Sequence, residues 1–265
     1  MAKIVAFYSY KGGVGRSLSL ANAAISLSQR GRRVVCVDFD LEAGGLHTIF
    51  GSTPKGIRFT LLDVLAPVGA VPVERAIVDL SSAVNNLGTG GGLWLLPSIP
   101  EISKIDRVMA DQRELSVVLS RVIEQIEEIL RPHVILVDSR SGFAELAATS
   151  IRVAQNLVCV MRPNRQNADG IRLLLRILAT RGGTPKPFLA LSQVPRAEPP
   201  LLNQSTIEQR IEELQRELGD FKFGAKIPFV PSLALDEIVE MNRDPGSPVA
   251  AAYRPIADWI DQEAQ

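Results

Sequence analysis

The first candidate site is a glycine-rich segment near the N-terminus, Ser9-Tyr10-Lys11-Gly12-Gly13-Val14-Gly15-Arg16-Ser17. It lies between an apolar run, Lys3–Tyr8, and an amphipathic run, Ser17–Arg30, which predict a strand and a helix. A glycine-rich turn in that position directs backbone N–H groups and the positive end of the helix dipole at one point, where a phosphate can bind. Ser17 is placed to bind a phosphate-bound magnesium ion, to cap the helix, or to do both.

Two residues differ from the general P-loop pattern. Tyr10 stands where the first glycine is expected, and Arg16 stands where the lysine is expected. The second difference has the larger consequence, because arginine offers a planar fork and a longer reach where lysine offers a compact charge. Arg16 can still neutralise β- and γ-phosphate oxygens, but with altered geometry. We therefore expect slow phosphoryl transfer.

Carboxylates end two further apolar runs. Asp38 and Asp40 follow Val34–Val37, and strand alternation places both on the same side. Asp138 ends Val134–Val137 and precedes the small-residue turn Ser139-Arg140-Ser141-Gly142. Ligands of open α/β sheets bind at the C-terminal edge of the strands, so we expect all three acids at the same crevice as the glycine-rich loop. Without that loop, Asp38 and Asp40 would be interpreted as a strand end and a helix cap.

Short β-branched runs alternate with longer amphipathic ones, which predicts parallel strands joined by crossover helices. The fold class expected is a three-layer α/β/α P-loop NTPase, a single domain over residues 1–265 with a mostly parallel sheet of about seven strands. The irregular stretch Gly51–Pro100 is expected to form short helices and loops. The predicted strands are Lys3–Tyr8, Arg33–Asp38, Leu93–Leu96, His133–Asp138, Leu157–Met161, Phe188–Ser192 and Ala225–Ile227. The predicted helices are Ser17–Arg30, Asp111–Leu130, Phe143–Val153, Ala168–Thr180, Ser205–Leu218, Leu233–Met241 and Val249–Glu263.

Composition narrows the classes of function. Lys plus Arg and Asp plus Glu both number 29 in the 265 residues, so any electrostatic argument must be local. Cys36 and Cys159 each lie in an apolar run, which argues against a disulfide framework and favours a reducing compartment. Every apolar run is shorter than the ~20 residues that cross a bilayer, so a cytoplasmic location is expected.

The segment Lys11-Gly12-Gly13-Val14-Gly15-x-Ser17 resembles the deviant Walker A signature of the ParA/MinD ATPases, in a KGGVGR variant. The resemblance implies ATP and Mg²⁺ as cofactors and an ATP-dependent sandwich homodimer. It implies that Lys11 reaches the phosphates bound by the other subunit and that Arg16 contacts the phosphates of its own. The residues it assigns to nucleotide contact are Lys11, Gly12, Gly13, Val14, Gly15, Arg16, Ser17 and Leu18.

The same resemblance assigns roles to the acids and to the base site. It gives Asp40 the attacking water, Asp38 a place in the magnesium shell beside Ser17, and Asp138 the magnesium through water, as in a Walker B strand. Pro228 and Phe229, in Ile227-Pro228-Phe229-Val230, match a segment that recognises adenine. Ser192-Gln193 replaces the Asn-containing pair expected after the preceding strand.

The sequence does not identify one binding partner. Between Ser139 and Lys186 there are eight basic residues and two acidic ones, a net charge of +6. These residues form either a face for non-specific DNA or ordinary solvated surface. The acidic end of the chain, Ile256–Gln265, argues against binding to anionic membranes. Two functions stay open: an ATP-hydrolysing switch whose ATP-bound dimer engages DNA or an unknown protein, or a nucleotide-sensing subunit in which Arg16 has removed most turnover.

Overall fold

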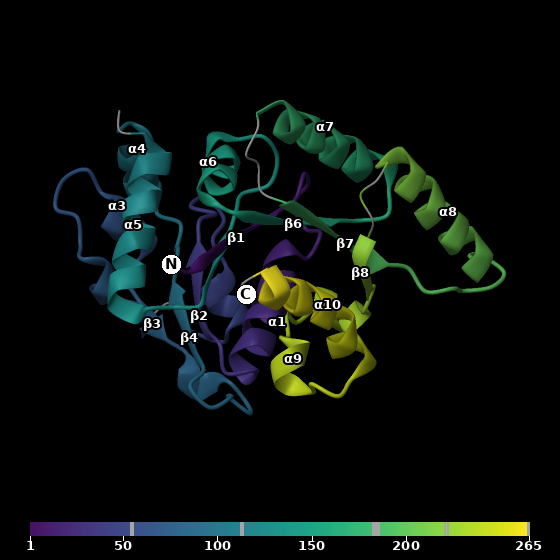
Figure 1. Ribbon diagram of the computed structural model, residues 1–265, viewed down its shortest axis with the longest axis horizontal. Helices are drawn as coiled ribbons and strands as arrows, with labels where there is room; N and C mark the ends of the chain where they lie inside the picture. Colours follow the sequence, from purple (N-terminus) through teal and green to yellow (C-terminus); the bar gives the residue numbers. More distant parts are fainter. Residues whose placement is uncertain (54–55, 112–113, 182–185, 220, 222, 264–265) are drawn as a thin grey trace.

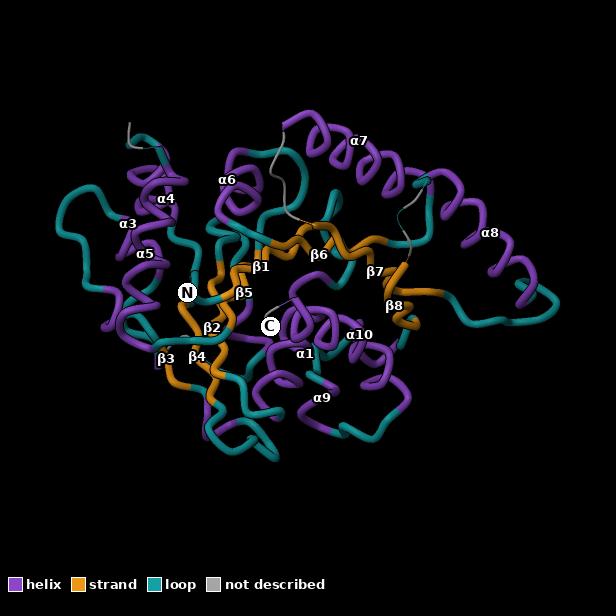
Figure 2. Tube along the Cα trace, viewed as in Figure 1, coloured by secondary structure: helices purple, strands orange, loops and turns teal. Residues whose placement is uncertain are grey.

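One sheet of eight strands organises the part of the chain that the structure, a computed structural model, describes (Figures 1 and 2): residues 1–53, 56–111, 114–181, 186–219, 221 and 223–263. The strand order is β3-β4-β2-β5-β1-β6-β7-β8. All neighbouring pairs are parallel except β3 and β4. The strands are β1 (Lys3–Tyr8), β2 (Arg33–Asp38), β3 (Val78–Asp79), β4 (Gly92–Leu96), β5 (Val134–Asp138), β6 (Asn156–Met161), β7 (Lys186–Val194) and β8 (Phe223–Pro228).

Helices cover both faces of this sheet and make three layers, as the sequence predicts (Figure 1). One face carries α1 (Arg16–Gln29), α2 (Leu46–Ile49), α9 (Glu240–Arg243) and α10 (Pro248–Glu263). The other face carries α3 (Leu61–Leu65), α4 (Ile102–Met109), α5 (Leu115–Leu130), α6 (Glu145–Val153), α7 (Arg165–Arg181) and α8 (Gln204–Glu217). Three short 3₁₀ helices complete the described elements: η2 (Val73–Arg75), η3 (Ser81–Ala83) and η4 (Pro231–Ala234).

The alternation of side chains along β2 explains why both faces are covered. Val34 and Cys36 pack into the core on the α1 side, whereas Val35 and Val37 pack into the core beneath α5. All four side chains are fully buried. A strand that is apolar on both sides must be enclosed by helices on both sides, which is why parallel sheets have near-continuous apolar strands.

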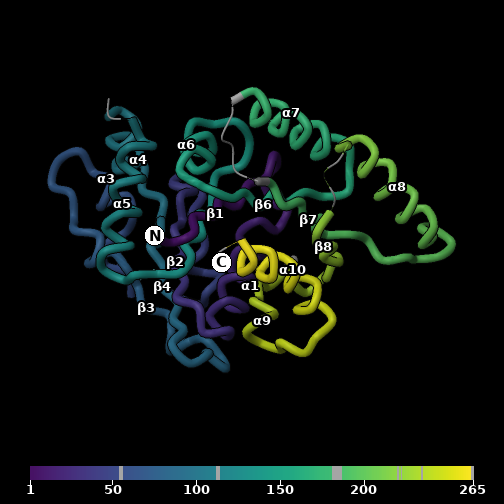
Figure 3. Tube along the Cα trace, in the orientation of Figure 1, coloured from purple at the N-terminus to yellow at the C-terminus, as the bar shows by residue number. Residues whose placement is uncertain are grey.

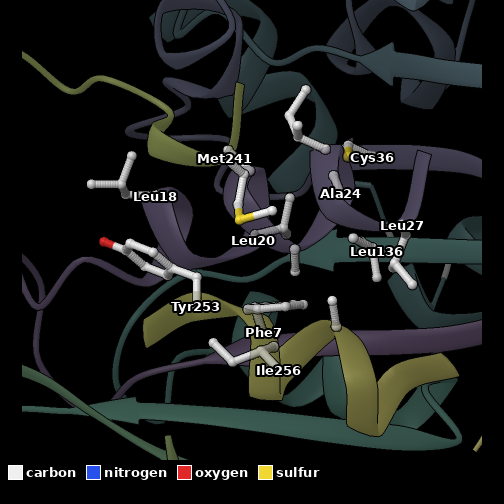
Figure 4. Close-up of a cluster of buried hydrophobic side chains, with 14 of the residues drawn as sticks. Phe7, Leu18, Leu20, Ala24, Leu27, Cys36, Leu136, Met241, Tyr253 and Ile256 are labelled. Atoms are coloured by element: carbon white, nitrogen blue, oxygen red, sulfur yellow. The ribbon is translucent and has the colours of Figure 1, made fainter. Parts of the chain in front are cut away.

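The first helix is enclosed by segments from the far end of the sequence. In Figure 3 the C-terminal segments α9 and α10 lie beside the N-terminal helix α1. Figure 4 shows Leu20 of α1 near Phe7 of β1 and Ile256 of α10. All three side chains are fully buried. The helix that follows the glycine-rich loop is therefore held by the sheet and by the end of the chain together.

Several predicted elements differ from those observed. The predicted helix Leu233–Met241 is wrong as one element, since the structure has η4 and α9 with an irregular segment between them. The start of the predicted helix Asp111–Leu130 is also wrong, because α5 begins at Leu115; residues 112–113 of that prediction lie outside the described residues. The sequence predicted neither α4 nor the short edge strand β3.

No helix among the described residues combines the length and the apolar character needed to cross a membrane.

Candidate functional site

The glycine-rich loop joins β1 to α1 at the C-terminal edge of the sheet. Gly15 precedes the helix with a left-handed backbone, φ +82°, and no side chain caps the helix at that point. The first bond of the helix runs from the Ser19 N–H to the Gly15 carbonyl oxygen at 2.9 Å. Glycine is needed here because a side chain strains a positive φ. The open N–H groups at this helix start are suited to binding an anion.

Ser17 does not cap α1. Its hydroxyl donates a hydrogen bond of 2.6 Å to Asp138 Oδ2, at the end of β5. Asp138 and Asp38 are register partners on β5 and β2, so the sheet brings both acids to the same edge. The structure therefore brings Ser17 of the loop, Asp38 and Asp138 to one edge of the sheet.

Arg16 makes the strongest charged contacts of the site. Its Nε donates to Asp138 Oδ1 at 2.6 Å, and its Nη2 donates to Asp40 Oδ2 at 3.1 Å. Only 8% of Arg16 is exposed. Burial by itself lowers the pKa of the guanidinium, but the two carboxylates outweigh burial and raise it overall. The side chain predicted to contact phosphates thus binds two acids in this structure.

Asp38 is fully buried, and its Oδ2 accepts a hydrogen bond of 3.0 Å from the N–H of Leu46, the first residue of α2. Its Oδ1 has no hydrogen-bond partner among the residues that the structure describes. Burial, together with the negative charge of Asp138, raises the pKa of the Asp38 carboxyl well above its usual range. Burial also raises the pKa of Asp138, although the ion pair with Arg16 opposes that effect.

The oxygen atoms gathered here suit a hard divalent cation. Carboxylates and a serine hydroxyl are the donors that Mg²⁺ prefers. Within the described part of the chain, Asp38 Oδ1 and Asp40 Oδ1 are both buried without a hydrogen-bond partner. The residues therefore fit the magnesium that the sequence predicts. No three Asp, Glu, His or Cys side chains of the described ranges are arranged to hold a metal ion, however, and the Arg16 guanidinium bridges Asp40 and Asp138.

Lys11 lies over the aromatic ring of its neighbour Tyr10. Its Nζ is 5.3 Å from the centre of the Tyr10 ring, in a cation–π arrangement. The Tyr10 ring packs against Phe143 with ring centres 5.6 Å apart. It also fills the space beside Gly170 of α7, where a Cβ would lie 2.0 Å from the Tyr10 ring. The tyrosine that replaces the first P-loop glycine thus has a matching space in the fold.

Three side chains hold the loop's carbonyl groups, and the sequence had not given them this role. Arg162 Nη2 and Gln193 Nε2 both donate to the Gly13 carbonyl oxygen, at 2.5 and 2.9 Å. Ser192 Oγ donates to the Val14 carbonyl oxygen at 2.5 Å. Arg162 follows β6, which pairs with the loop's own strand β1, and Ser192 and Gln193 lie near the end of β7, the next strand in the sheet. Their polar side chains at apolar strand ends were the available signal, because such ends converge in a parallel sheet.

The loop opens into a cavity of about 1220 Å³. Ten of the predicted site residues line it: Gly12, Gly13, Val14, Gly15, Arg16, Ser17, Leu18, Asp40, Pro228 and Phe229. Lys11, Asp38 and Asp138 are not among its lining residues. Pro228 ends β8 and Phe229 is 41% exposed, so this segment forms the wall farthest along the sheet from the acids. The cavity is large enough for a nucleotide.

The basic stretch between Ser139 and Lys186 is partly neutralised. Arg140 pairs with Glu42, Arg152 pairs with Glu114 at 3.3 Å, and Arg172 pairs with Asp169 at 2.6 Å. The side chains of Arg181 and Lys186 lie outside the described residues. Arg165 and Arg176 are exposed on α7. The net charge of +6 counted from the sequence is therefore larger than the unpaired positive charge that this stretch offers to a binding partner.

Known proteins resemble this chain in sequence and in fold. The septum site-determining protein MinD of Synechocystis is 28% identical over 163 residues, which cover 62% of this chain and just over half, 54%, of that protein. The chromosome partitioning protein ParA of Caulobacter vibrioides is 24% identical over 226 residues, covering 85% of this chain and 80% of ParA. The structure of MinD from Pyrococcus horikoshii in complex with Mg-ADP superposes with a TM-score of 0.75 at 23% identity, covering 100% of this chain and 98% of that one.

A family sequence model described as "AAA domain" (AAA_31) matches residues 2–187, which include the glycine-rich loop, Arg16 and all three acids. Because this match spans well over half of the chain, the protein belongs to the AAA_31 family and is a P-loop NTPase of the ParA/MinD type.

Proposed function

We propose that this protein is an ATP-dependent molecular switch: it binds ATP with Mg²⁺, dimerises and hydrolyses ATP slowly. The observation that carries the proposal is the 2.6 Å hydrogen bond between Ser17, on the glycine-rich loop, and Asp138, at the end of β5. It joins the loop suited to phosphate to an acid suited to magnesium. In bound protein Ser17 and Asp138 would hold the Mg²⁺, which supplies charge neutralisation at the phosphates. The two buried free cysteines support a cytoplasmic location.

ATP binding is tested by calorimetry with a non-hydrolysable ATP analogue and Mg²⁺. Gly15→Ala is expected to weaken binding at least about tenfold, because the added Cβ strains φ +82° where the backbone must approach the phosphate. Gly90→Ala is the matched control, since Gly90 has φ +77° and, like Gly15, nothing within 4 Å of an added Cβ. Absence of binding by the wild type would refute the proposal. Equal weakening in both variants would indicate general strain.

The proposed dimer depends on Lys11. Its Nζ lies over Tyr10 and outside the cavity lining, which leaves it free to reach phosphates bound by a second subunit. Lys11→Ala is expected to reduce analogue-driven dimerisation and turnover together while monomeric binding is largely kept. Light scattering measures the dimer, and Lys226→Ala, which removes an exposed lysine of β8, is the control. A wild type that stays monomeric with bound analogue contradicts this part of the proposal.

The ATP-bound dimer is proposed to engage DNA or a protein partner, and not a membrane. ParA, a chromosome partitioning protein, motivates a DNA test. The ion pairs of Arg140, Arg152 and Arg172 favour a protein. Fluorescence anisotropy with random duplex DNA at several salt concentrations separates the two, because phosphate contacts give a steep salt dependence.

A second candidate function is a nucleotide-sensing subunit with little turnover, and the Arg16 ion pairs favour it. Asp40, the residue proposed to orient water, is held by Arg16 at 3.1 Å. The measurement that separates the candidates is phosphate release with and without DNA and candidate partners. A wild type that binds ATP but releases no more phosphate than Asp40→Ala under every condition is a sensor.

A further inference from the structure

One side chain contacts three of the polar groups that would bind a divalent cation. The Arg16 guanidinium donates to Asp138 at 2.6 Å and to Asp40 at 3.1 Å, and its Nη2 lies 3.4 Å from Ser17 Oγ. It is nine-tenths buried at the place where these groups converge. The Arg16 guanidinium therefore occupies the place where a metal cation would bind between these oxygen atoms.

We propose that Arg16 is an exchangeable internal cation, which holds the divalent-cation site closed in the empty protein and leaves it when Mg-nucleotide binds. The exchange on nucleotide binding rests on the proposed function. The closure of the empty site does not, because it follows from contacts within the chain. In the nucleotide-free protein Arg16 is thus a positioning residue for Asp40 and Asp138. It becomes a phosphate ligand only when nucleotide binds.

The charges require such a cation. Asp38, Asp40 and Asp138 are all buried, and they lie together: Asp38 and Asp138 are register partners, and Arg16 joins Asp138 to Asp40. Buried carboxylates are unfavourable unless a positive group or a metal ion compensates them. Arg16 brings one positive charge, and Asp38 Oδ1 and Asp40 Oδ1 still have no hydrogen-bond partner in the described ranges. A divalent ion brings two charges and accepts further oxygen ligands, so it can replace the guanidinium.

The two cations exclude each other. Arg16 uses Oδ1 of Asp138, and Ser17 donates its hydroxyl proton to Oδ2 of the same carboxylate. A metal ion at this position needs lone pairs that these bonds occupy. The guanidinium has a new site nearby: Arg16 is the first residue of α1 and lines the cavity, so phosphate oxygens can replace its two carboxylates. Nucleotide and metal are therefore expected to bind together.

The test measures Mn²⁺, a spectroscopic substitute for Mg²⁺, in nucleotide-free protein by the loss of the free-ion EPR signal. Nucleotide-free wild type is expected to bind no Mn²⁺. When ADP is added, the protein with ADP should bind more Mn²⁺ than the same concentration of ADP without protein. Arg16→Gln is expected to bind Mn²⁺ without nucleotide, at least about tenfold more tightly than wild type. Arg32→Gln is the matched control, because Arg32 Nε pairs with Asp261 Oδ1 at 2.7 Å, nearly the geometry of Arg16 with Asp138. It should behave as wild type.

The proposal is overturned if nucleotide-free wild type binds Mn²⁺ as tightly as Arg16→Gln does. It is also overturned if Arg16→Gln folds but binds Mn²⁺ no more tightly than wild type. If Arg16→Gln does not fold, the wild-type comparison with and without ADP still decides, because metal binding before nucleotide contradicts the closed site. If ADP does not bind at all, the proposed function fails, whereas the Arg16→Gln comparison still tests the internal cation.

Discussion

Arginine at position 16 can bind two carboxylates at once because its guanidinium presents several donors in one plane. Here one edge of the group binds Asp138 and one terminal nitrogen binds Asp40. A lysine ammonium is a single point charge on a shorter reach. The identity of this one residue therefore decides whether Asp40 and Asp138 share one cationic partner.

Replacing Arg16 by lysine is expected to preserve ATP binding and to maintain or raise turnover. The lysine can still neutralise β- and γ-phosphate oxygens, and it competes less for Asp40 and Asp138. Rates of phosphate release at saturating Mg-ATP measure this. If Arg16→Lys abolishes a turnover that wild type shows, the arginine is a specialised catalytic group.

Asp40→Ala is expected to trap the proposed ATP-bound dimer by removing the side chain that we propose orients water. Such positioning groups supply much of the rate in phosphoryl transfer. Size-exclusion chromatography after incubation with Mg-ATP should show a dimer that persists in Asp40→Ala and decays in wild type. Equal decay in both proteins would remove Asp40 from the mechanism.

Among the elements, α1 connects the loop to distant parts of the chain. Asn22 Oδ1 accepts a hydrogen bond of 2.9 Å from the N–H of Met241 in α9, and Gln29 Nε2 donates to the Met241 carbonyl oxygen at 3.0 Å. The Asn22 side chain is fully buried and donates to the Leu18 carbonyl oxygen as well. The helix that follows the glycine-rich loop is thus tied to the α9 segment, where Val239 and Asn242 line the cavity.

These side-chain bonds also explain which elements could be predicted from the sequence. The strands and helices around the loop have long, regular apolar patterns, and most were predicted within a few residues. The segment Leu233–Met241 has helical spacing but is not one helix, because Asn22 and Gln29 fix the Met241 backbone and residues such as Ile238 line the cavity. Tertiary contacts of this kind override local periodicity.

In the candidate site, too, the sequence predicts some features and not others. The glycine-rich loop and the acids were found because each ends or follows an apolar strand, and parallel strands end at one edge. The ion pairs of Arg16 could not be found in this way. Which of two partners, a phosphate or a carboxylate, a long side chain contacts depends on distances of a few ångströms that sequence spacing does not encode.

The short helix α3 gives a prediction of pH dependence. Asp63 accepts hydrogen bonds from the backbone N–H and the hydroxyl of Thr60, and pairs with Lys104 of α4 at 2.8 Å. Burial raises the pKa of Asp63, but the bonds to Lys104 and Thr60 outweigh it and lower the pKa overall. The ionised form is therefore more stable in the folded chain than in the unfolded one. The resulting stability is present above the usual Asp range, near ~4, and is lost as the pH falls through the lower folded pKa.

Asp63→Asn is expected to lower the free energy of unfolding by about 1 kcal/mol at neutral pH, because Asp63 is the N3 residue of a capping box with the N-cap Thr60 and capping interactions are typically of this size. The difference from wild type should shrink below pH ~4. Urea unfolding at both pH values measures it. Asp258→Asn is the control, because Asp258 pairs with Arg30 but is half exposed, and exposed pairs contribute little. A difference independent of pH would assign the loss to packing.

At the scale of the whole molecule, the first and last helices of the chain share one core with β1 (Figure 4). The glycine-rich loop connects β1 to α1. Packing in that core therefore fixes both ends of the loop. Ligand binding and folding should consequently be coupled: whatever loosens the core weakens the loop, and whatever binds the loop stabilises the core.

Ile256→Ala tests this coupling. Ile256 is fully buried, and removing its side chain is expected to lower the free energy of unfolding by about 2–5 kcal/mol, because the cavity left behind loses its packing contacts. Ile102→Ala, at a residue 79% exposed, should change it by less than about 0.5 kcal/mol. A ligand present at 100 times its Kd adds about 2.7 kcal/mol to the folded state, so Mg-ATP analogue should recover much of the loss in Ile256→Ala. Thermal unfolding with and without the analogue gives both quantities. If the analogue binds but raises the Tm of neither wild type nor Ile256→Ala, the loop orders independently of the core that α10 completes.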